Sequence, residues 1–335
     1  MKLLFYRNFQ WLSCVFLLLG CSNDVKFAVP PSSQEFNQSV AYNNKVDFLF
    51  VVDNSKSMNK VQENLLSSLV PLTTTLNQLK LDYHVGSTST TMASWYPMSG
   101  KIFGEPKFLT SLTPDFQNRL TEKIMIGDTG STVEKGLDAI KSILSFPFQN
   151  GDGQTFLRSD ALLVIVYLTN EDDKSDKIDT GNSNNQTKHY SDFLDSVRPL
   201  WSNGQRSWIF NFIGITSQND ACTTGDLTDY KEPGIRLMEM AKKSSGRIET
   251  ICQIKLDLAI SNIKARLVQF LTDYKLNKIP IVDSIRVYVN QILIPMDPSS
   301  GWSYLPDLNV VRFNGDSVPK ADDDIRVDFT PDGSN

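Results

Sequence analysis

Apolar residues along the chain occur in two arrangements, and their alternation predicts the fold. Nearly continuous apolar runs such as ALLVIVYL at residues 161–168 are typical of strands buried on both faces of a parallel sheet. Between these runs, apolar residues recur at the spacing of an amphipathic helix. Strands are expected at residues 46–52, 81–92, 161–168, 207–216 and 247–251. Helices are expected at residues 61–79, with a kink at Pro71, and at 116–124, 132–144, 191–200, 233–244 and 256–270.

This alternation predicts an α/β domain over residues 45–278, with a doubly wound, mostly parallel sheet and helices on both faces. In such folds, ligands bind at the carboxyl ends of the strands.

The pattern changes after about residue 279. Apolar residues now alternate with polar ones, as in the segments 285–289 and 325–329, and Asn314-Gly315 is a turn signal. Residues 279–335 are therefore expected to form a small all-β appendage with its tail. Its function is not readable from the sequence.

The first 44 residues have the pattern of an export signal and a tether. Lys2 and Arg7 precede an apolar stretch that is too short to span a bilayer, which needs about 20 residues. Leu-Gly-Cys at positions 19–21 resembles the cleavage site of a bacterial lipoprotein, in which Cys21 carries the lipid. Residues 1–20 would be the signal peptide and residues 21–44 the polar tether. The alternative is an ordinary signal with an incidental cysteine.

The lipoprotein interpretation places the chain in the bacterial cell envelope, attached to the membrane through its lipid alone. Ser22 is not the Asp that resembles an inner-membrane retention signal, so the outer membrane is favoured. Cys14 would leave with the signal, so Cys222 and Cys252 remain as a candidate disulfide in an oxidising compartment. Two separate buried thiols are the alternative.

Composition narrows the function classes. The chain has 335 residues, of which 40% are hydrophobic and 21% charged, enough for a real core. Its net charge of −5 argues against a nucleic-acid surface, which is normally basic.

Three oxygen-rich segments follow or flank the predicted strands. They are Asp53-x-Ser55-x-Ser57, the loop GDTGST at residues 127–132, and TNEDD at residues 169–173. Neither a histidine nor a thiol occurs in them, which suits a hard cation: Mg²⁺ first, with Mn²⁺ or Ca²⁺ as alternatives. Neutral hydroxyl ligands leave such a cation short of negative charge. A carboxylate from a partner protein would supply it.

These residues resemble the metal-ion-dependent adhesion site of a von Willebrand factor type A domain. The resemblance covers residues 45–275, and more narrowly the chain looks like bacterial lipoproteins that carry this domain. It implies a cation bound by Ser55, Ser57 and Ser131 or Thr132, with Asp53 and Asn170 acting directly or through water. Asn170 stands where the family usually has Asp, and Asp172 is a candidate to compensate.

The resemblance implies adhesion or envelope assembly, through a protein partner that presents Asp or Glu, and no enzymatic turnover. One alternative is a scaffold with a degenerate, metal-free site, because Asn170 brings no charge. Another is an envelope hydrolase, although the chain has no Gly-x-Ser-x-Gly elbow and His84 lies within a strand. Asp53 and the serines also have a simpler interpretation as helix caps.

Overall fold

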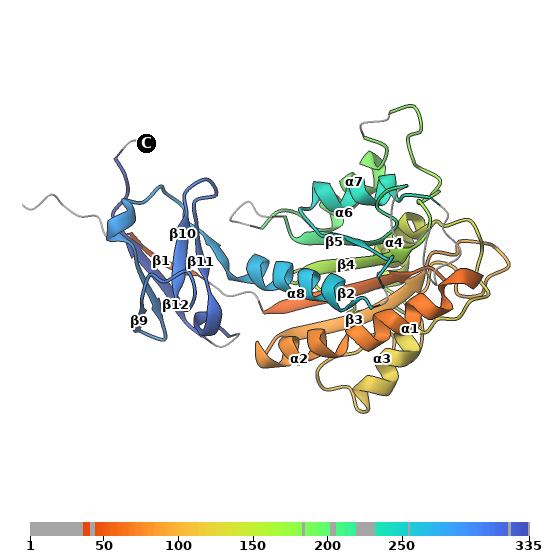
Figure 1. Ribbon diagram of the computed structural model, residues 1–335, viewed down its shortest axis with the longest axis horizontal. Coiled ribbons are helices and arrows are strands. Elements are labelled where there is room, and N and C mark those ends of the chain that lie inside the picture. Colours follow the sequence, from red (N-terminus) through yellow and green to blue (C-terminus); the bar gives the residue numbers. More distant parts are fainter. Residues whose placement is uncertain are drawn as a thin grey trace, which may run out of the picture. The chain divides into compact units, whose positions relative to one another are not determined.

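The computed structural model describes residues 36–40, 44–182, 185–201, 206–218, 232–253, 255–320 and 323–333. Within these residues, the expected α/β architecture is confirmed. A five-stranded, all-parallel sheet is flanked by helices, and small antiparallel sheets form near the C-terminus (Figure 1).

The parallel sheet is built from the predicted strand segments. Its strands are β2 (Lys45–Val52), β3 (Asp82–Ser89), β4 (Leu162–Thr169), β5 (Trp208–Gly214) and β6 (Ile248–Thr250). Their order across the sheet is β3-β2-β4-β5-β6. The chain leaves β2 toward one side of the sheet and then crosses to β4 on the other side. The winding therefore reverses between β2 and β4, whose paired residues end with Val52 opposite Leu168.

Helices cover both faces because the strands carry apolar side chains on both sides. Phe48 and Phe50 pack into one core, whereas Leu49 and Val51 pack into the other. The first core is covered by α1 (Asn59–Ser68), α2 (Val70–Gln78), α3 (Phe116–Ile124) and α8 (Asp257–Thr272). The second is covered by α4 (Gly136–Leu144), α5 (Phe146–Gln149), α6 (Lys188–Val197) and α7 (Ile235–Lys243).

The kink expected at Pro71 is confirmed as a break between two helices. Helix α1 ends at Ser68 and α2 begins at Val70, with Pro71 in its first turn, where a proline needs no N–H donor. Helix α4 begins at Gly136 and so later than the expected Thr132. The carboxylate of Asp173 accepts the N–H of Leu137 at 3.0 Å and so caps the start of α4.

The C-terminal strands form two small antiparallel sheets around a core of their own. One has the order β1-β12-β8-β9 and the other the order β10-β11-β7. The strands are β1 (Phe36–Val40), β7 (Asp273–Lys275), β8 (Arg286–Val289), β9 (Ile292–Ile294), β10 (Trp302–Leu305), β11 (Val310–Phe313) and β12 (Ile325–Phe329). Alternate residues such as Val287, Val311 and Ile325 are fully buried in this core, as the period of two predicts.

Two of these strands lie outside the residues expected for the appendage. The segment Phe36–Val40 was expected to belong to the tether, but it forms β1 and pairs with β12 from Phe36 opposite Phe329. Strand β7 lies within the expected α/β domain but pairs with β11. Backbone pairing to a distant segment leaves no local sequence signal, so neither assignment was visible in the pattern.

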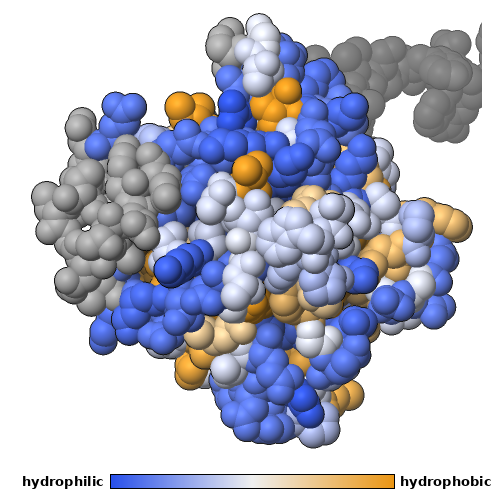
Figure 2. Space-filling view, turned by 90° about the vertical axis from the view of Figure 1, so that its right-hand side faces the viewer, coloured by the Kyte–Doolittle hydropathy of each residue, from blue (hydrophilic) through white to orange (hydrophobic). Residues whose placement is uncertain are grey.

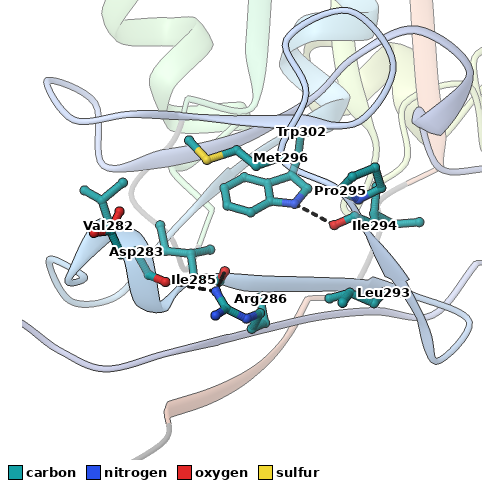
Figure 3. A pocket seen from close by; sticks show the side chains of 9 residues that line it. All are labelled: Val282, Asp283, Ile285, Arg286, Leu293, Ile294, Pro295, Met296 and Trp302. Carbon is teal, nitrogen blue, oxygen red and sulfur yellow. Dashed lines mark hydrogen bonds between the residues drawn. The ribbon is translucent and has the colours of Figure 1, made fainter.

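The β part also carries a pocket of about 280 Å³ with mainly apolar walls (Figure 3). The indole N–H of Trp302 donates to the carbonyl of Ile294 at 2.9 Å. The guanidinium of Arg286 donates to the carbonyls of Asp283 and Ile285, at 2.9 and 2.8 Å. These bonds engage the indole N–H and the guanidinium, and most of the other residues that line the hollow are apolar.

Candidate metal centre

The three oxygen-rich segments meet at the carboxyl edge of the parallel sheet. The hydroxyl of Thr169, at the end of β4, donates to Asp53 Oδ2 at 2.8 Å. The N–H of Gly130 donates to the carbonyl of Asn54 at 2.7 Å. Figure 2 views the molecule from the side at which these strands end, and much of that face is hydrophilic. The contacts confirm that the segments after β2, after β4 and before α4 are neighbours in space.

Asp53 is buried and hydrogen-bonded within this cluster. Its side chain is fully buried, and its Oδ1 accepts the N–H of Ser55 at 2.7 Å. Burial raises the pKa of Asp53 to about 6, against the lowering effect of the hydrogen bonds from Ser55 and Thr169. The carboxylate therefore shapes the loop that leaves β2.

Ser55, Ser57 and Asn170 lie beside Asp53. The hydroxyl oxygens of Ser55 and Ser57 are 3.4 Å apart, and a short 3₁₀ helix, η1 (Lys56–Met58), turns the chain between them. The amide nitrogen of Asn170 donates to Ser57 Oγ at 3.2 Å. Coordination by Asn170 needs its oxygen instead, which a half-turn of the amide would present. These four predicted residues are thus brought together.

Ser131 is connected to the same cluster through a relay of side chains. Its N–H donates to Thr91 Oγ1 at 2.9 Å, and the Thr91 hydroxyl donates to Asn54 Oδ1 at 2.8 Å. Ser131 Oγ accepts the N–H of Val133 at 2.9 Å. Thr132 is exposed. Of the two candidates in this loop, Ser131 is therefore the one whose backbone is connected, through Thr91 and Asn54, to the loop that contains Asp53.

Asp172 has a different set of contacts. Its Oδ1 accepts the N–H of Arg236 at 3.0 Å, and its Oδ2 lies 3.4 Å from the Arg236 guanidinium. Burial raises the pKa of Asp172 to about 6, although the charge of Arg236 works to lower it. Within the described residues no hydrogen bond joins Asp172 to Asp53, Ser55 or Ser57. The expected compensation for Asn170 by Asp172 has no support in this geometry.

The other acids after β4 are also engaged. Asp173 accepts the hydroxyl of Tyr167 at 2.8 Å in addition to its bond to α4. The carboxylate of Glu171 lies 3.5 Å from the ammonium of Lys174. Asp176, expected in a solvated loop, is exposed and pairs with Lys135. These acids serve the fold of the loop.

Several residues that organise the site were not predicted from the sequence. Gln62 is fully buried in α1, and its amide donates to the carbonyls of Asp53 at 3.0 Å and Gly127 at 2.8 Å. The amide of Asn54 donates to the hydroxyl of Tyr96 at 2.8 Å. A glutamine beside the apolar stripe of α1 was the available signal for Gln62, whereas nothing in the pattern pointed to Tyr96.

The donor set fits a hard cation in kind, because it consists of hydroxyl, amide and carboxylate oxygens. Among the described residues, no three His, Cys, Asp or Glu side chains are grouped as a metal site. The candidate site therefore depends on neutral ligands and few charges.

His84, considered for a hydrolase, lies near the opposite end of the strands. It is opposite Asp47 in the register of β2 and β3, and its Nδ1 lies 2.9 Å from the carbonyl of Phe156. Burial lowers the pKa of His84. These contacts give it a structural role.

Gly130 is required by the close approach of its loop to the Asp53 motif. A Cβ at this position would lie 2.3 Å from Asn54 Oδ1 and 2.6 Å from Thr91 Oγ1. We expect Gly130→Ala to lower the free energy of unfolding by about 1–3 kcal/mol, the usual cost of overpacking. Urea denaturation measures this. Gly181→Ala is the control, because its Cβ would lie 3.4 Å from Asp179. It should change the free energy of unfolding by less than about 0.5 kcal/mol. Equal losses of stability in the two variants would contradict the close packing at Gly130.

Some predictions fall on residues outside the described part of the chain. The signal peptide at residues 1–20, the lipid-bearing Cys21 and Cys222 belong to this group. Cys252 is disulfide-bonded, and its pairing with Cys222 stays a prediction. None of the helices in the described ranges combines the length and the apolar character needed to cross a bilayer.

Comparisons with known proteins give little further information. No model of a protein family matches the chain, and no curated protein matches it. Among solved structures, the pilus adhesin SpaC from Lactobacillus rhamnosus GG in its open conformation matches with 11% identity and a TM-score of 0.43, covering 88% of this chain and 40% of that chain. Proximal thread matrix protein 1 from the mussel byssus matches with 10% identity and a TM-score of 0.39, covering 68% of this chain and 49% of that chain. The chain thus spans less than half the length of either protein.

Proposed function

We propose that residues 45–278 form a von Willebrand factor type A domain that binds a divalent cation and, through it, a carboxylate of a partner protein. One observation carries this proposal. Asp53, Ser55, Ser57 and Asn170 converge at the carboxyl ends of β2 and β4. The winding of the sheet reverses between these two strands, and such a point is where open α/β sheets bind ligands.

The residues have distinct roles in this proposal. Ser55 and Ser57 bind the cation as neutral ligands, together with Ser131 or Thr132. Asp53 orients the Ser55 backbone through its 2.7 Å hydrogen bond, and Asn170 binds directly or through water. A bound cation, Mg²⁺ first and Mn²⁺ or Ca²⁺ otherwise, supplies positive charge for an external Asp or Glu.

The cellular setting belongs to the same proposal. A chain with lipid at Cys21 would be attached to a bacterial envelope, with the outer membrane favoured, and would act in adhesion or assembly without enzymatic turnover.

A scaffold with a metal-free site is the second candidate. The observation in its favour is that Asp172, the candidate to supply the charge that Asn170 lacks, is bound to Arg236. In that case the loops at the strand ends serve the fold alone.

Titration calorimetry with Mg²⁺, Mn²⁺ and Ca²⁺ separates the two candidates. We expect the purified full chain to bind Mg²⁺ with measurable heat, because three hydroxyls and a buried carboxylate favour a hard cation. EDTA should remove the bound Mg²⁺. Absence of heat with all three cations would favour the scaffold. A pull-down from envelope extracts with and without EDTA then tests whether partner binding follows the cation.

A further inference from the structure

Glu134, in the loop before α4, is a buried carboxyl group that no cationic side chain pairs with among the described residues. Its side chain is fully buried, and neither carboxylate oxygen has a hydrogen-bond partner among the described residues. The hydroxyl of Thr90, also fully buried, faces this carboxyl group but lies outside normal hydrogen-bond geometry. A buried charge is strongly unfavourable unless it is paired or coordinates a metal. A cation is one partner that would stabilise the ionised form of Glu134 in this position.

The backbone fixes Glu134 between the ends of two strands. Its carbonyl accepts the N–H of Lys174, beyond β4, at 2.7 Å, and the N–H of Lys135 donates to the carbonyl of Thr90, just after β3, at 2.8 Å. Strand β2, which ends at Asp53, lies between β3 and β4 in the sheet. Glu134 thus belongs to the same carboxyl edge as the Asp53 motif.

Electrostatics point to the same neighbourhood. The charges that act on the buried Glu134 side chain are those of Asp53, Glu171 and Asp173, and the Thr90 hydroxyl also faces it. Two of these acids have partners of their own, Lys174 for Glu171 and Tyr167 for Asp173. A buried carboxylate without a cationic partner, at the same edge of the sheet as Asp53, is a suitable ligand for an oxygen-bound cation.

We propose that Glu134 is a carboxylate ligand of the cation at the Asp53 site, and that it supplies from the loop before α4 the negative charge that Asn170 does not bring. This inference rests on the proposed function, because it needs a cation at that site. It relocates the anionic ligand from the segment after β4, where Asp172 is bound to Arg236, to the segment that contains Ser131 and Thr132.

Calorimetric titration of Mg²⁺ into the full chain and its Glu134→Gln variant tests the assignment. We expect Glu134→Gln to weaken Mg²⁺ binding by about 10- to 100-fold, because the amide keeps the size but loses the charge of the ligand. The matched control is Glu171→Gln, which neutralises a buried carboxylate that already has Lys174 as its partner. Its affinity should stay within about twofold of that of the unaltered chain.

A rescue experiment adds a second readout. The double variant Glu134→Gln/Asn170→Asp should bind Mg²⁺ at least about tenfold more tightly than Glu134→Gln alone, since Asn170→Asp returns one charge to the site. In EDTA, the Tm of Glu134→Gln should be at or above that of the unaltered chain, because the amide keeps the size of the side chain and needs no cation to be stable when buried. A loss of stability in EDTA together with unchanged Mg²⁺ affinity would make Glu134 a structural residue.

The outcomes distinguish the two proposals. If the unaltered chain binds Mg²⁺ and Glu134→Gln binds it equally well, Glu134 is no ligand and this inference fails alone. If the unaltered chain binds none of the cations, the proposed function fails first and the inference with it. Should Glu134→Gln not fold, Glu134→Asp replaces it. That variant keeps the charge on a shorter side chain, and unchanged Mg²⁺ affinity in it would overturn the assignment.

Discussion

Replacing Asp47 with alanine is expected to lower the free energy of unfolding by about 3–5 kcal/mol, because it breaks a buried ion pair and leaves a charge behind. Asp47 is fully buried in β2. Its Oδ1 accepts the Arg158 side chain at 2.8 Å, and its Oδ2 accepts the Arg198 guanidinium at 3.0 Å. Arg198 is only 1% exposed, so its guanidinium would lose a buried partner. Urea denaturation of the variant measures the loss.

The Lys45–Asp160 pair is a matched control for Asp47. It joins the same part of the sheet, but its side chains are 38% and 60% exposed. Asp160→Ala should therefore cost less than about 1 kcal/mol, as surface ion pairs do. Asp47→Asn keeps the shape of the side chain and removes its charge. Its loss of stability should lie between those of Asp47→Ala and Asp160→Ala. If Asp47→Ala lowered the free energy of unfolding no more than Asp160→Ala, the Asp47 carboxylate would not be needed to stabilise Arg158 and Arg198.

The sequence was sufficient to predict the parallel sheet, because each strand is specified by its own residues. Runs such as ALLVIVYL at 161–168 are apolar at every position, and a strand buried on both faces requires that. Strand β4 fills both cores and has no exposed residue. The helix expected at 116–124 forms with those bounds as α3.

The short strands of the β part were less predictable. Strands β1 and β7 are specified by the partners β12 and β11, which lie far from them in sequence. The polar composition around Phe36–Val40 favoured a tether, since an edge strand needs few apolar residues of its own. Pairing between distant segments decided the structure there.

The candidate site was predictable in its position but not in its charges. The carboxyl ends of parallel strands share an edge, so Asp53 and Asn170 had to be neighbours once the sheet was predicted. The partner of each acid depends on tertiary packing. Asp172 therefore appeared free to compensate for Asn170 until α7 placed Arg236 against it. Glu134 gave no signal, because a single Glu before a helix is ordinary helix-capping composition.

Asp53→Ala is expected to have the largest effect on function, a loss of Mg²⁺ affinity of at least about 100-fold. The carboxylate fixes the N–H of Ser55 at 2.7 Å and the hydroxyl of Thr169 at 2.8 Å. Without it, the loop that holds the Ser55 and Ser57 hydroxyls 3.4 Å apart loses its anchor. Titration calorimetry measures the affinity, and a pull-down measures cation-dependent partner binding, which should disappear as well.

The fold should survive this change, so that the loss can be assigned to the site. The N–H of Ser55 and the hydroxyl of Thr169 both lose their acceptor. Each unsatisfied buried donor costs about 1–3 kcal/mol, compared with a total stability of about 5–15 kcal/mol. Asp176→Ala is the control, because this acid also follows β4 but is 68% exposed and pairs with Lys135. Its Mg²⁺ affinity should be unchanged. If partner binding persisted in Asp53→Ala and in EDTA, the partner would be held by a surface other than the cation, and the metal-dependent mechanism would be wrong.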